Sequence, residues 1–175
     1  LIRWVINVAS TGINPYVDER VNRSSKRLGG RLSFFLATVA AELRYRPITV
    51  ALSLDGGAPT EHTIATLAVC NGRYGGGGMV FGPDATPHDG VLDVVVIEPR
   101  GLPAGLGLLR AMYRGEQARL PGVAIHPART VHVAPVAGDA RLDLDGEAVG
   151  AAPVSFTVEP GRLRALRPRA GGATR

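Results

Sequence analysis

Apolar residues occur along most of the chain in short runs or in strict alternation with polar residues, and Gly, Pro and Asp separate these segments. Short apolar or alternating segments bounded by such turn residues are typical of β-strands. The pattern predicts strands over residues 1–8, 48–54, 63–70, 79–81, 92–97, 130–135, 140–144, 154–158 and 163–166. The Asp-Gly pairs at 55–56 and 145–146 predict tight hairpin turns.

Two longer segments have helical character instead. Residues 30–43 are mostly helix formers with little charge, and residues 103–113 interrupt the series of strands. Asn14-Pro15 followed by acidic residues predicts the start of a further short helix. Many short strands and few helices favour a mainly β fold, an antiparallel β-sandwich with a few accessory α-helices at one side or end, over alternating βαβ units.

The length of 175 residues and the hydrophobic content of 45% are sufficient for one globular domain, with two small lobes as the alternative. We expect one domain over residues 1–167 and a basic tail over 168–175. The chain begins at Leu1, directly on a strand-like run, which predicts that it is a piece of a longer protein. No apolar run approaches the roughly 18 residues that span a bilayer.

The composition limits the cellular compartment and the kinds of partner that we expect. The single cysteine, Cys70, lies in an apolar run, which excludes a disulfide framework and a CxxC zinc site and indicates a reducing, cytoplasmic compartment. The net charge is +5, and Lys26 is the sole lysine, so arginine carries the positive charge. Arginine suits anionic partners, although codon usage produces the same bias, and we expect no nucleic acid partner.

Three local patterns are candidates for chemistry, and each has a purely structural alternative. The glycines at 75–78 lack the residues of a Walker or dinucleotide motif, so alone they favour a turn over a phosphate cradle. Asp84, Asp89 and Asp93 form an oxygen-rich bend that either holds Mg²⁺ or Ca²⁺ or is an Asx-type turn without an ion. Glu147, at the tip of a hairpin, is a solvated residue unless a neighbouring element desolvates it and presents a hydroxyl group to it.

Other common sites are not indicated. The histidines at 62, 88, 126 and 132 show no paired metal-ligand spacing, and no Gly-x-Ser-x-Gly elbow is present.

Taken in order, the segments resemble the C-terminal half of the diacylglycerol kinase catalytic family, bacterial lipid kinases related to sphingosine and ceramide kinases. The matching stretches are 7–12 (NVASTG), 26–34 (KRLGGRLSF), 69–77 (VCNGRYGGG), 83–85 (PDA), 89–93 (DGVLD), 145–147 (DGE) and 158–161 (VEPG). They extend over almost the whole chain in the family's order. The resemblance implies the second domain of a two-domain enzyme whose N-terminal domain binds ATP through a Gly-Gly-Asp-Gly-Thr motif. That motif is absent here and would precede Leu1, so the fragment alone is expected to be inactive.

The resemblance also implies roles for individual residues. Glu147 matches the family's proton acceptor for the lipid hydroxyl group. The side chain of Asp89 and the backbone carbonyls of Thr86 and Val91 match a structural Mg²⁺ site, with the two carbonyls less specific because any residue provides one. Gly75, Gly76 and Gly77 would allow close approach of ATP or of the neighbouring domain.

The implied partners are a lipid alcohol and an anionic membrane surface at the inner face of the membrane. The basic residues Arg20, Arg23, Lys26, Arg27 and Arg31 suit peripheral membrane contact. The apolar residues 32–43 either line an acyl-chain pocket or cover the core. The acceptor's identity and a homodimer stay open, and the alternatives are an NAD kinase-like enzyme and a non-catalytic lipid- or protein-binding module.

Overall fold

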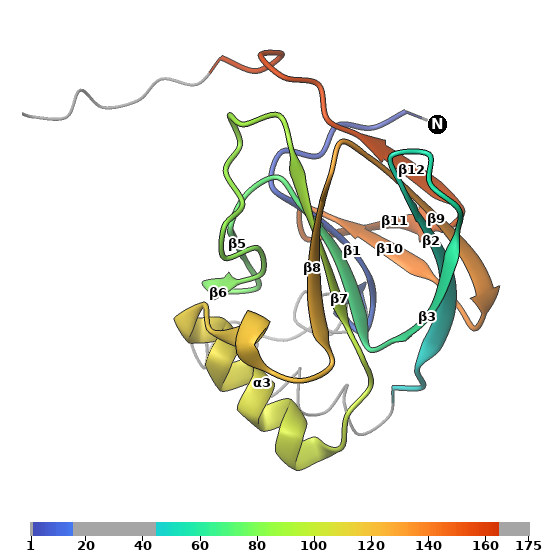
Figure 1. Cartoon of the computed structure of the whole chain (residues 1–175), viewed down its shortest axis with the longest axis vertical. Coiled ribbons are helices and arrows are strands. Elements are labelled where there is room, and N and C mark those ends of the chain that lie inside the picture. Colours follow the sequence, from blue (N-terminus) through green and yellow to red (C-terminus); the bar gives the residue numbers. More distant parts are fainter. Residues whose placement is uncertain (1, 16–44, 165–175) are drawn as a thin grey trace, which may run out of the picture.

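The computed structural model describes residues 2–15 and 45–164, and in these ranges the chain forms two packed antiparallel sheets with one α-helix beside them (Figure 1). Sheet A has six strands in the order β11-β10-β1-β4-β7-β8, and sheet B has four in the order β12-β9-β2-β3. The strands of sheet A are β1 (Val8–Gly12), β4 (Thr66–Cys70), β7 (Leu92–Ile97), β8 (Val123–Ala128), β10 (Arg141–Leu144) and β11 (Glu147–Ala151). Those of sheet B are β2 (Ile48–Leu54), β3 (Thr60–Ile64), β9 (Thr130–Ala137) and β12 (Val154–Thr157). A small hairpin consists of β5 (Tyr74–Gly75) and β6 (Met79–Val80). The expected antiparallel β-sandwich is confirmed.

Both faces of sheet A are buried, and β7 shows how its sequence allows this. Val94 and Val96 point into the core between the two sheets, where Val50, Leu52, Val131 and Val133 of sheet B meet them. Val95 and Ile97 point into a second core on the opposite face. Because alternate side chains of a strand leave opposite faces, a strand covered on both sides must be apolar throughout. This is why residues 92–97 read as one nearly continuous apolar run.

The second core is closed by the helix and the small hairpin. The helix α3 (Leu102–Arg114) begins next to Pro103 and ends at Gly115, whose φ of 71° is left-handed. Its buried side chains Leu109 and Met112 pack with Met79 and Phe81 against sheet A. The short 3-10 helix η2 (Gln117–Arg119) follows directly. The accessory helix therefore lies on one side of the sandwich, as predicted.

The first strand is not where the apolar pattern placed it. Residues 2–5 have no regular structure, and Ile2, Trp4 and Ile6 are exposed. β1 begins at Val8 and pairs with β4 on one side and with β10 on the other, so even Ser10 and Thr11 are buried. The prediction of a strand over 1–8 was wrong because partners far away in the sequence, not local hydrophobicity, select the residues that become the strand.

Other boundaries also differ. The run 63–70 is divided between two sheets: β3 ends at Ile64, and β4 begins at Thr66. The strands β8 and β11 were not predicted. Residues 163–164 carry no regular structure, so the strand expected at 163–166 is not found where the chain is described.

The helix predicted to start at Asn14-Pro15 begins there, since residues 14 and 15 are helical, and the chain from residue 16 lies outside the described part. Also outside it are the basic cluster from Arg20 to Arg31, the apolar segment 32–43 and the tail at 168–175. Among the helices of the described part, none has the length and apolar character needed to cross a bilayer.

Candidate functional site

One end of sheet A collects the candidate residues. β4 and β10 end there, and β1, β7 and β11 begin there, because neighbouring strands are antiparallel. The register places Val8 beside Cys70 and Cys70 beside Asp93, while Leu144 lies beside both Ala9 and Glu147. Glu147, the loop after Cys70 and the acidic bend before β7 therefore share one edge of the sheet. We refer to it as the site edge.

Glu147 is the first residue of β11 and follows a tight turn. Asp145 and Gly146 have φ values of 53° and 90°, the left-handed conformations of a two-residue hairpin loop. The Glu147 side chain is exposed and lines a surface pocket of about 230 Å³. The other lining residues are Arg3, Trp4, Leu144, Asp145 and Val149. A carboxylate thus faces a small cavity that also presents an indole and a guanidinium group.

Asp145 joins this hairpin to the segment before β1. Its Oδ2 accepts a hydrogen bond from the backbone N–H of Ile6 at 2.8 Å, and its Oδ1 accepts those of Asn7 at 3.0 Å and Val8 at 2.9 Å. Its own N–H donates to the Val8 carbonyl at 2.9 Å. Four hydrogen bonds therefore hold the turn against residues that lie nearly 140 positions earlier in the chain.

Asn7 continues the network to the loop after β4. Its carbonyl accepts hydrogen bonds from the N–H groups of Asn71 and Gly72, both at 2.9 Å, and its Nδ2 donates to the Tyr74 carbonyl at 2.6 Å. Asn71 Nδ2 donates in return to the Ile6 carbonyl at 2.7 Å. The approach is close: a Cβ on Gly72 would lie 2.3 Å from Asn7 Oδ1, so this position accepts only glycine without rearrangement.

The glycine run forms the turn between β5 and β6. Gly76 and Gly77 have φ values of 50° and 77°, and Gly78 N–H donates to the Gly75 carbonyl at 3.1 Å. Gly78 is also left-handed, with a φ of 100°, so three such residues form the loop between the paired residues Gly75 and Met79, and glycine is preferred in this conformation. The tip is open, since nothing lies within 4 Å of a Cβ built on Gly77. The conformation of the turn therefore explains why glycines occur at these positions, and the tip of the turn is exposed to solvent.

Gln117 anchors the far end of this hairpin. Its buried side-chain Nε2 donates to the carbonyls of Val80 at 2.6 Å and Phe81 at 3.0 Å. The hairpin is therefore attached to the fold both through Asn7 and through η2.

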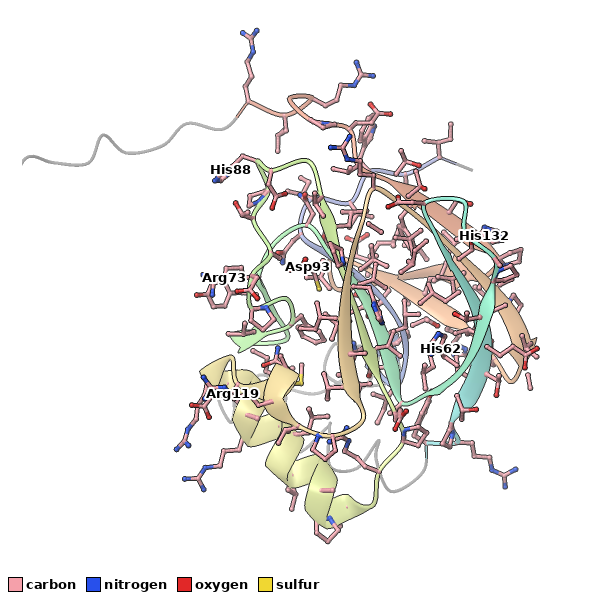
Figure 2. The ribbon with its side chains drawn as sticks, in the orientation of Figure 1. His62, Arg73, His88, Asp93, Arg119 and His132 are labelled. Carbon is pink, nitrogen blue, oxygen red and sulfur yellow. The ribbon has the colours of Figure 1, made fainter. Side chains whose placement is uncertain are left out.

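The acidic bend before β7 is organised by Asp89. Its Oδ1 accepts the Val91 N–H at 3.0 Å, which makes an Asx-type turn, and its N–H lies 3.5 Å from the Thr86 carbonyl oxygen. Asp93 follows at the start of β7 (Figure 2). Burial raises the pKa of the Asp93 carboxyl group, and the nearby carboxylates of Asp84 and Asp89 raise it further.

The donors in this bend fit a hard divalent cation. Asp93 Oδ2 is buried and has no hydrogen-bond partner in the described part of the chain, although two further carboxylates are nearby. A cation would relieve both the desolvation and the mutual repulsion of these groups. Residues 2–15 and 45–164 contain no group of three His, Cys, Asp or Glu side chains arranged to hold a metal. A site here would therefore combine Asp89 with backbone carbonyls, and Thr86 and Val91 lie in the same bend.

The structure brings the candidates to one edge without placing all of them in one pocket. Four strand spacings separate β11 from β7 in sheet A, which is about 19 Å at about 4.8 Å per spacing. The pocket beside Glu147 does not include Asp89 or the glycine turn. Glu147 and the acidic bend are thus separate positions along the site edge.

None of the four histidines lines the pocket beside Glu147, and neither does Cys70. His62 on β3 and His132 on β9 belong to sheet B, and His88 lies in the loop before β7 (Figure 2). His62 Nε2 contacts Thr60 Oγ1 and His132 Nδ1 contacts Ser155 Oγ, both at 2.9 Å. Cys70 is buried, and desolvation raises the pKa of its thiol, so it is not a reactive thiolate.

The residues that sequence reasoning missed are Arg3 and Trp4, which line the pocket, and the anchoring role of Asp145. The Asp-Gly pair indicated the turn, but no pattern in the sequence indicated which distant backbone amides the Asp145 carboxylate would accept.

The chain matches a known family over most of its length. Residues 7–167 match the family described as "YegS C-terminal NAD kinase beta sandwich-like domain". A protein named "Diacylglycerol kinase" from Mycobacterium tuberculosis is 32% identical over 97% of this chain and 54% of its own length. One named "Probable lipid kinase YegS-like" from Stenotrophomonas maltophilia is 31% identical over 92% of this chain and 52% of its own length. The chain thus spans about half the length of the curated relatives that it matches.

A solved structure shares the fold. The crystal structure of a diacylglycerol kinase from Bacillus anthracis str. Sterne superposes with a TM-score of 0.63 at 22% identity, over 90% of this chain and 50% of that one.

Proposed function

Because the chain belongs to the family of YegS C-terminal NAD kinase β-sandwich-like domains, we propose that it provides the acceptor side of an ATP-dependent lipid kinase. The observation that carries this proposal is the position of Glu147: an exposed carboxylate at the rim of a small pocket, on the site edge. Its relatives named as lipid kinases support the reaction class. The nucleotide side of the active site would come from a separate ATP-binding domain.

In this proposal Glu147 accepts the proton of the lipid hydroxyl group. As the hydroxyl oxygen bonds to the γ-phosphorus of ATP, the bond to the oxygen that bridges to ADP breaks, and the proton moves to the Glu147 carboxylate and then to solvent. Phosphoryl transfer depends mostly on positioning and on charge stabilisation, so a base on a short, well-anchored hairpin suits the reaction. The apolar side chains of Leu144 and Val149 beside it would receive the carbon atoms next to the hydroxyl group.

The acidic bend would hold Mg²⁺ through the Asp89 carboxylate and the carbonyls of Thr86 and Val91. When bound, the cation would neutralise the bend and brace it. The hydrogen bond from Val91 N–H to Asp89 Oδ1 holds the bend in a tight turn, which would keep the Asp89 carboxylate close to these carbonyls.

The glycine turn would lie against ATP or against the nucleotide-binding domain. Its support is the open tip at Gly77 together with the anchoring of the hairpin by Asn7 and Gln117. The lipid alcohol would be presented by an anionic membrane surface at the cytoplasmic face of the membrane. A homodimer remains compatible with these roles.

The test is a transfer assay on the natural protein that contains this chain. Radiolabelled ATP is offered with a panel of lipid alcohols, with NAD as an additional acceptor, to the wild type and to Glu147→Gln. The Glu147 side chain is exposed and the substitution leaves the backbone pairing of β11 intact, so we expect kcat to fall by about 10²- to 10⁴-fold with little change in melting temperature. Glu61→Gln on sheet B removes the same charge from an exposed strand position and should keep full activity.

Transfer to a lipid alcohol that needs Glu147 would support the proposal. Transfer to NAD alone, or a Glu147→Gln variant as active as Glu61→Gln, would refute it.

A further inference from the structure

The Asp145 carboxylate accepts more hydrogen bonds than its hairpin turn requires. A hairpin turn of this kind needs only left-handed backbone at its two central positions, which Asp and Gly provide without a side-chain contact. Here both carboxylate oxygens are also engaged by the consecutive N–H groups of Ile6, Asn7 and Val8 at 2.8–3.0 Å. Charge-assisted hydrogen bonds of this length are about twice as strong as neutral ones.

These contacts assemble the pocket that Glu147 faces. Two of its lining residues, Arg3 and Trp4, belong to residues 2–5, which have no regular structure of their own. The other four, Leu144, Asp145, Glu147 and Val149, belong to the β10–β11 hairpin. The carboxylate binds the chain two residues after Trp4 and thereby helps to position Arg3 and Trp4 against the hairpin, while the Arg162 guanidinium carbon lies 5.7 Å from the centroid of the Trp4 ring.

The same contacts extend along the site edge. Asn7, whose N–H binds Asp145, also accepts hydrogen bonds from Asn71 and Gly72 and donates one to Tyr74. A series of hydrogen bonds therefore leads from the turn before Glu147 to the hairpin that carries the glycines. The two candidate contact points, about three strands apart, are linked through a single short segment.

We propose that Asp145 is a positioning residue: its carboxylate holds residues 6–8 so that Arg3 and Trp4 complete the acceptor pocket and Glu147 keeps a defined distance from the glycine turn. The proposal rests on the proposed function for its catalytic consequence. The assembly of the pocket can be measured without any activity.

The chain contains a matched control. Asp55 starts the other Asp-Gly turn, with a φ of 50° and with Gly56 at 75°. Its Oδ1 accepts the N–H groups of Arg129 and Thr130, both at 2.8 Å. This turn connects β2 to β3 in sheet B and contributes nothing to the pocket beside Glu147. Asparagine tolerates left-handed backbone as aspartate does, so Asp→Asn at either turn removes the charge and one acceptor while keeping the turn.

The first experiment compares wild type, Asp145→Asn and Asp55→Asn as the 175-residue chain. Amide hydrogen exchange is followed at Ile6, Asn7 and Val8, and fluorescence anisotropy is followed at Trp4, the one tryptophan of the chain. We expect exchange at these amides to become at least about tenfold faster, and the anisotropy of Trp4 to fall, in Asp145→Asn only. Unchanged exchange and anisotropy in Asp145→Asn, or equal changes in both variants, would overturn the proposal.

The second experiment measures kinetics in the natural protein that contains the chain. In Asp145→Asn we expect kcat to fall by about 10- to 100-fold, because a small displacement of a reacting group lowers the rate by this much. The KM for ATP should stay within about twofold of the wild-type value. Asp55→Asn should leave both constants unchanged. A normal kcat in Asp145→Asn would overturn the catalytic consequence. If the wild type transferred phosphate to no lipid alcohol, the proposed function would fail, and exchange and anisotropy would decide the assembly role separately.

Discussion

Gly72 offers a direct test of the contact between the start of β1 and the loop after β4. In Gly72→Ala the new Cβ would lie 2.3 Å from Asn7 Oδ1 and 3.3 Å from its Cγ. The φ of Gly72 is not left-handed, so backbone strain does not contribute. The Asn7 side chain must rotate away, and the hydrogen bond from its Nδ2 to the Tyr74 carbonyl, 2.6 Å long, is lost.

The magnitude follows from three contributions. Loss of the hydrogen bond costs about 0.5–1.5 kcal/mol, and a displaced rotamer costs about the same again. Alanine lowers the conformational entropy of the unfolded chain, which stabilises the folded state by about 0.4–1 kcal/mol. The free energy of unfolding should therefore fall by about 1 kcal/mol, which corresponds to a decrease of about 2–4 °C in melting temperature for a domain of this size.

Gly107→Ala is the control. Gly107 lies on the exposed side of α3, and nothing is within 4 Å of a Cβ built there, so alanine should raise stability by about 0.5–1 kcal/mol. A double-mutant cycle with Asn7→Ala isolates the contact, since in that background Gly72→Ala has no side chain to displace. Urea unfolding of the four variants in the cycle gives the coupling energy.

Two results would refute this reasoning: a Gly72→Ala variant as stable as Gly107→Ala, or a cost for Gly72→Ala that persists undiminished in the Asn7→Ala background. Either would mean that Asn7 does not occupy the space beside Gly72.

Two further predictions concern charge. The N–H groups of Thr130 and then Arg129 hold the pKa of the Asp55 carboxyl group below its ordinary value of 3.8, so its contribution to stability is present above that pH and is lost as the pH falls below it. The difference in melting temperature between wild type and Asp55→Asn should therefore be constant near neutrality and disappear in acid; a difference that grows in acid would contradict this. Mg²⁺ at ten times its dissociation constant should stabilise the wild type by about 1.4 kcal/mol, and Asp89→Asn should reduce this gain while Glu61→Gln retains it. Equal Mg²⁺ stabilisation of all three proteins in thermal unfolding would place the ion elsewhere.

Where burial on both faces dictated composition, the sequence alone was sufficient. The strand β7 was predicted with its observed bounds, because a strand covered on both sides is nearly continuously apolar and is bounded by turn residues. The bounds of β2 were also predicted, from its alternation of apolar residues with smaller or polar ones, which matches its alternating burial. The helix α3 was predicted within one residue at each end for a similar reason, since Pro103 and Gly115 mark its limits. The Asp-Gly turns were also readable, because left-handed backbone strongly favours these residues.

Strands that form mainly because a neighbouring strand pairs with them could not be predicted from the sequence. β11 has the sequence EAVGA, with little apolar pattern, and it is a strand because β10 provides hydrogen bonds to its backbone. β1 contains the polar residues Ser10 and Thr11, and it lies between β4 and β10 while the more apolar residues before it stay exposed.

The same division applies to the candidate site. Motifs in the sequence pointed to Glu147, to the acidic bend and to the glycines, since residue type and local spacing carry that information. Only the tertiary structure decided that Glu147, the acidic bend and the loop leading from Cys70 to the glycine hairpin share one edge of sheet A, and that Asp145 binds amides nearly 140 residues away. The physical reason is that a turn or an apolar periodicity is specified by neighbours along the chain. A hydrogen bond from a backbone amide is not, because every residue except proline has such an amide, and the sequence does not indicate which one donates.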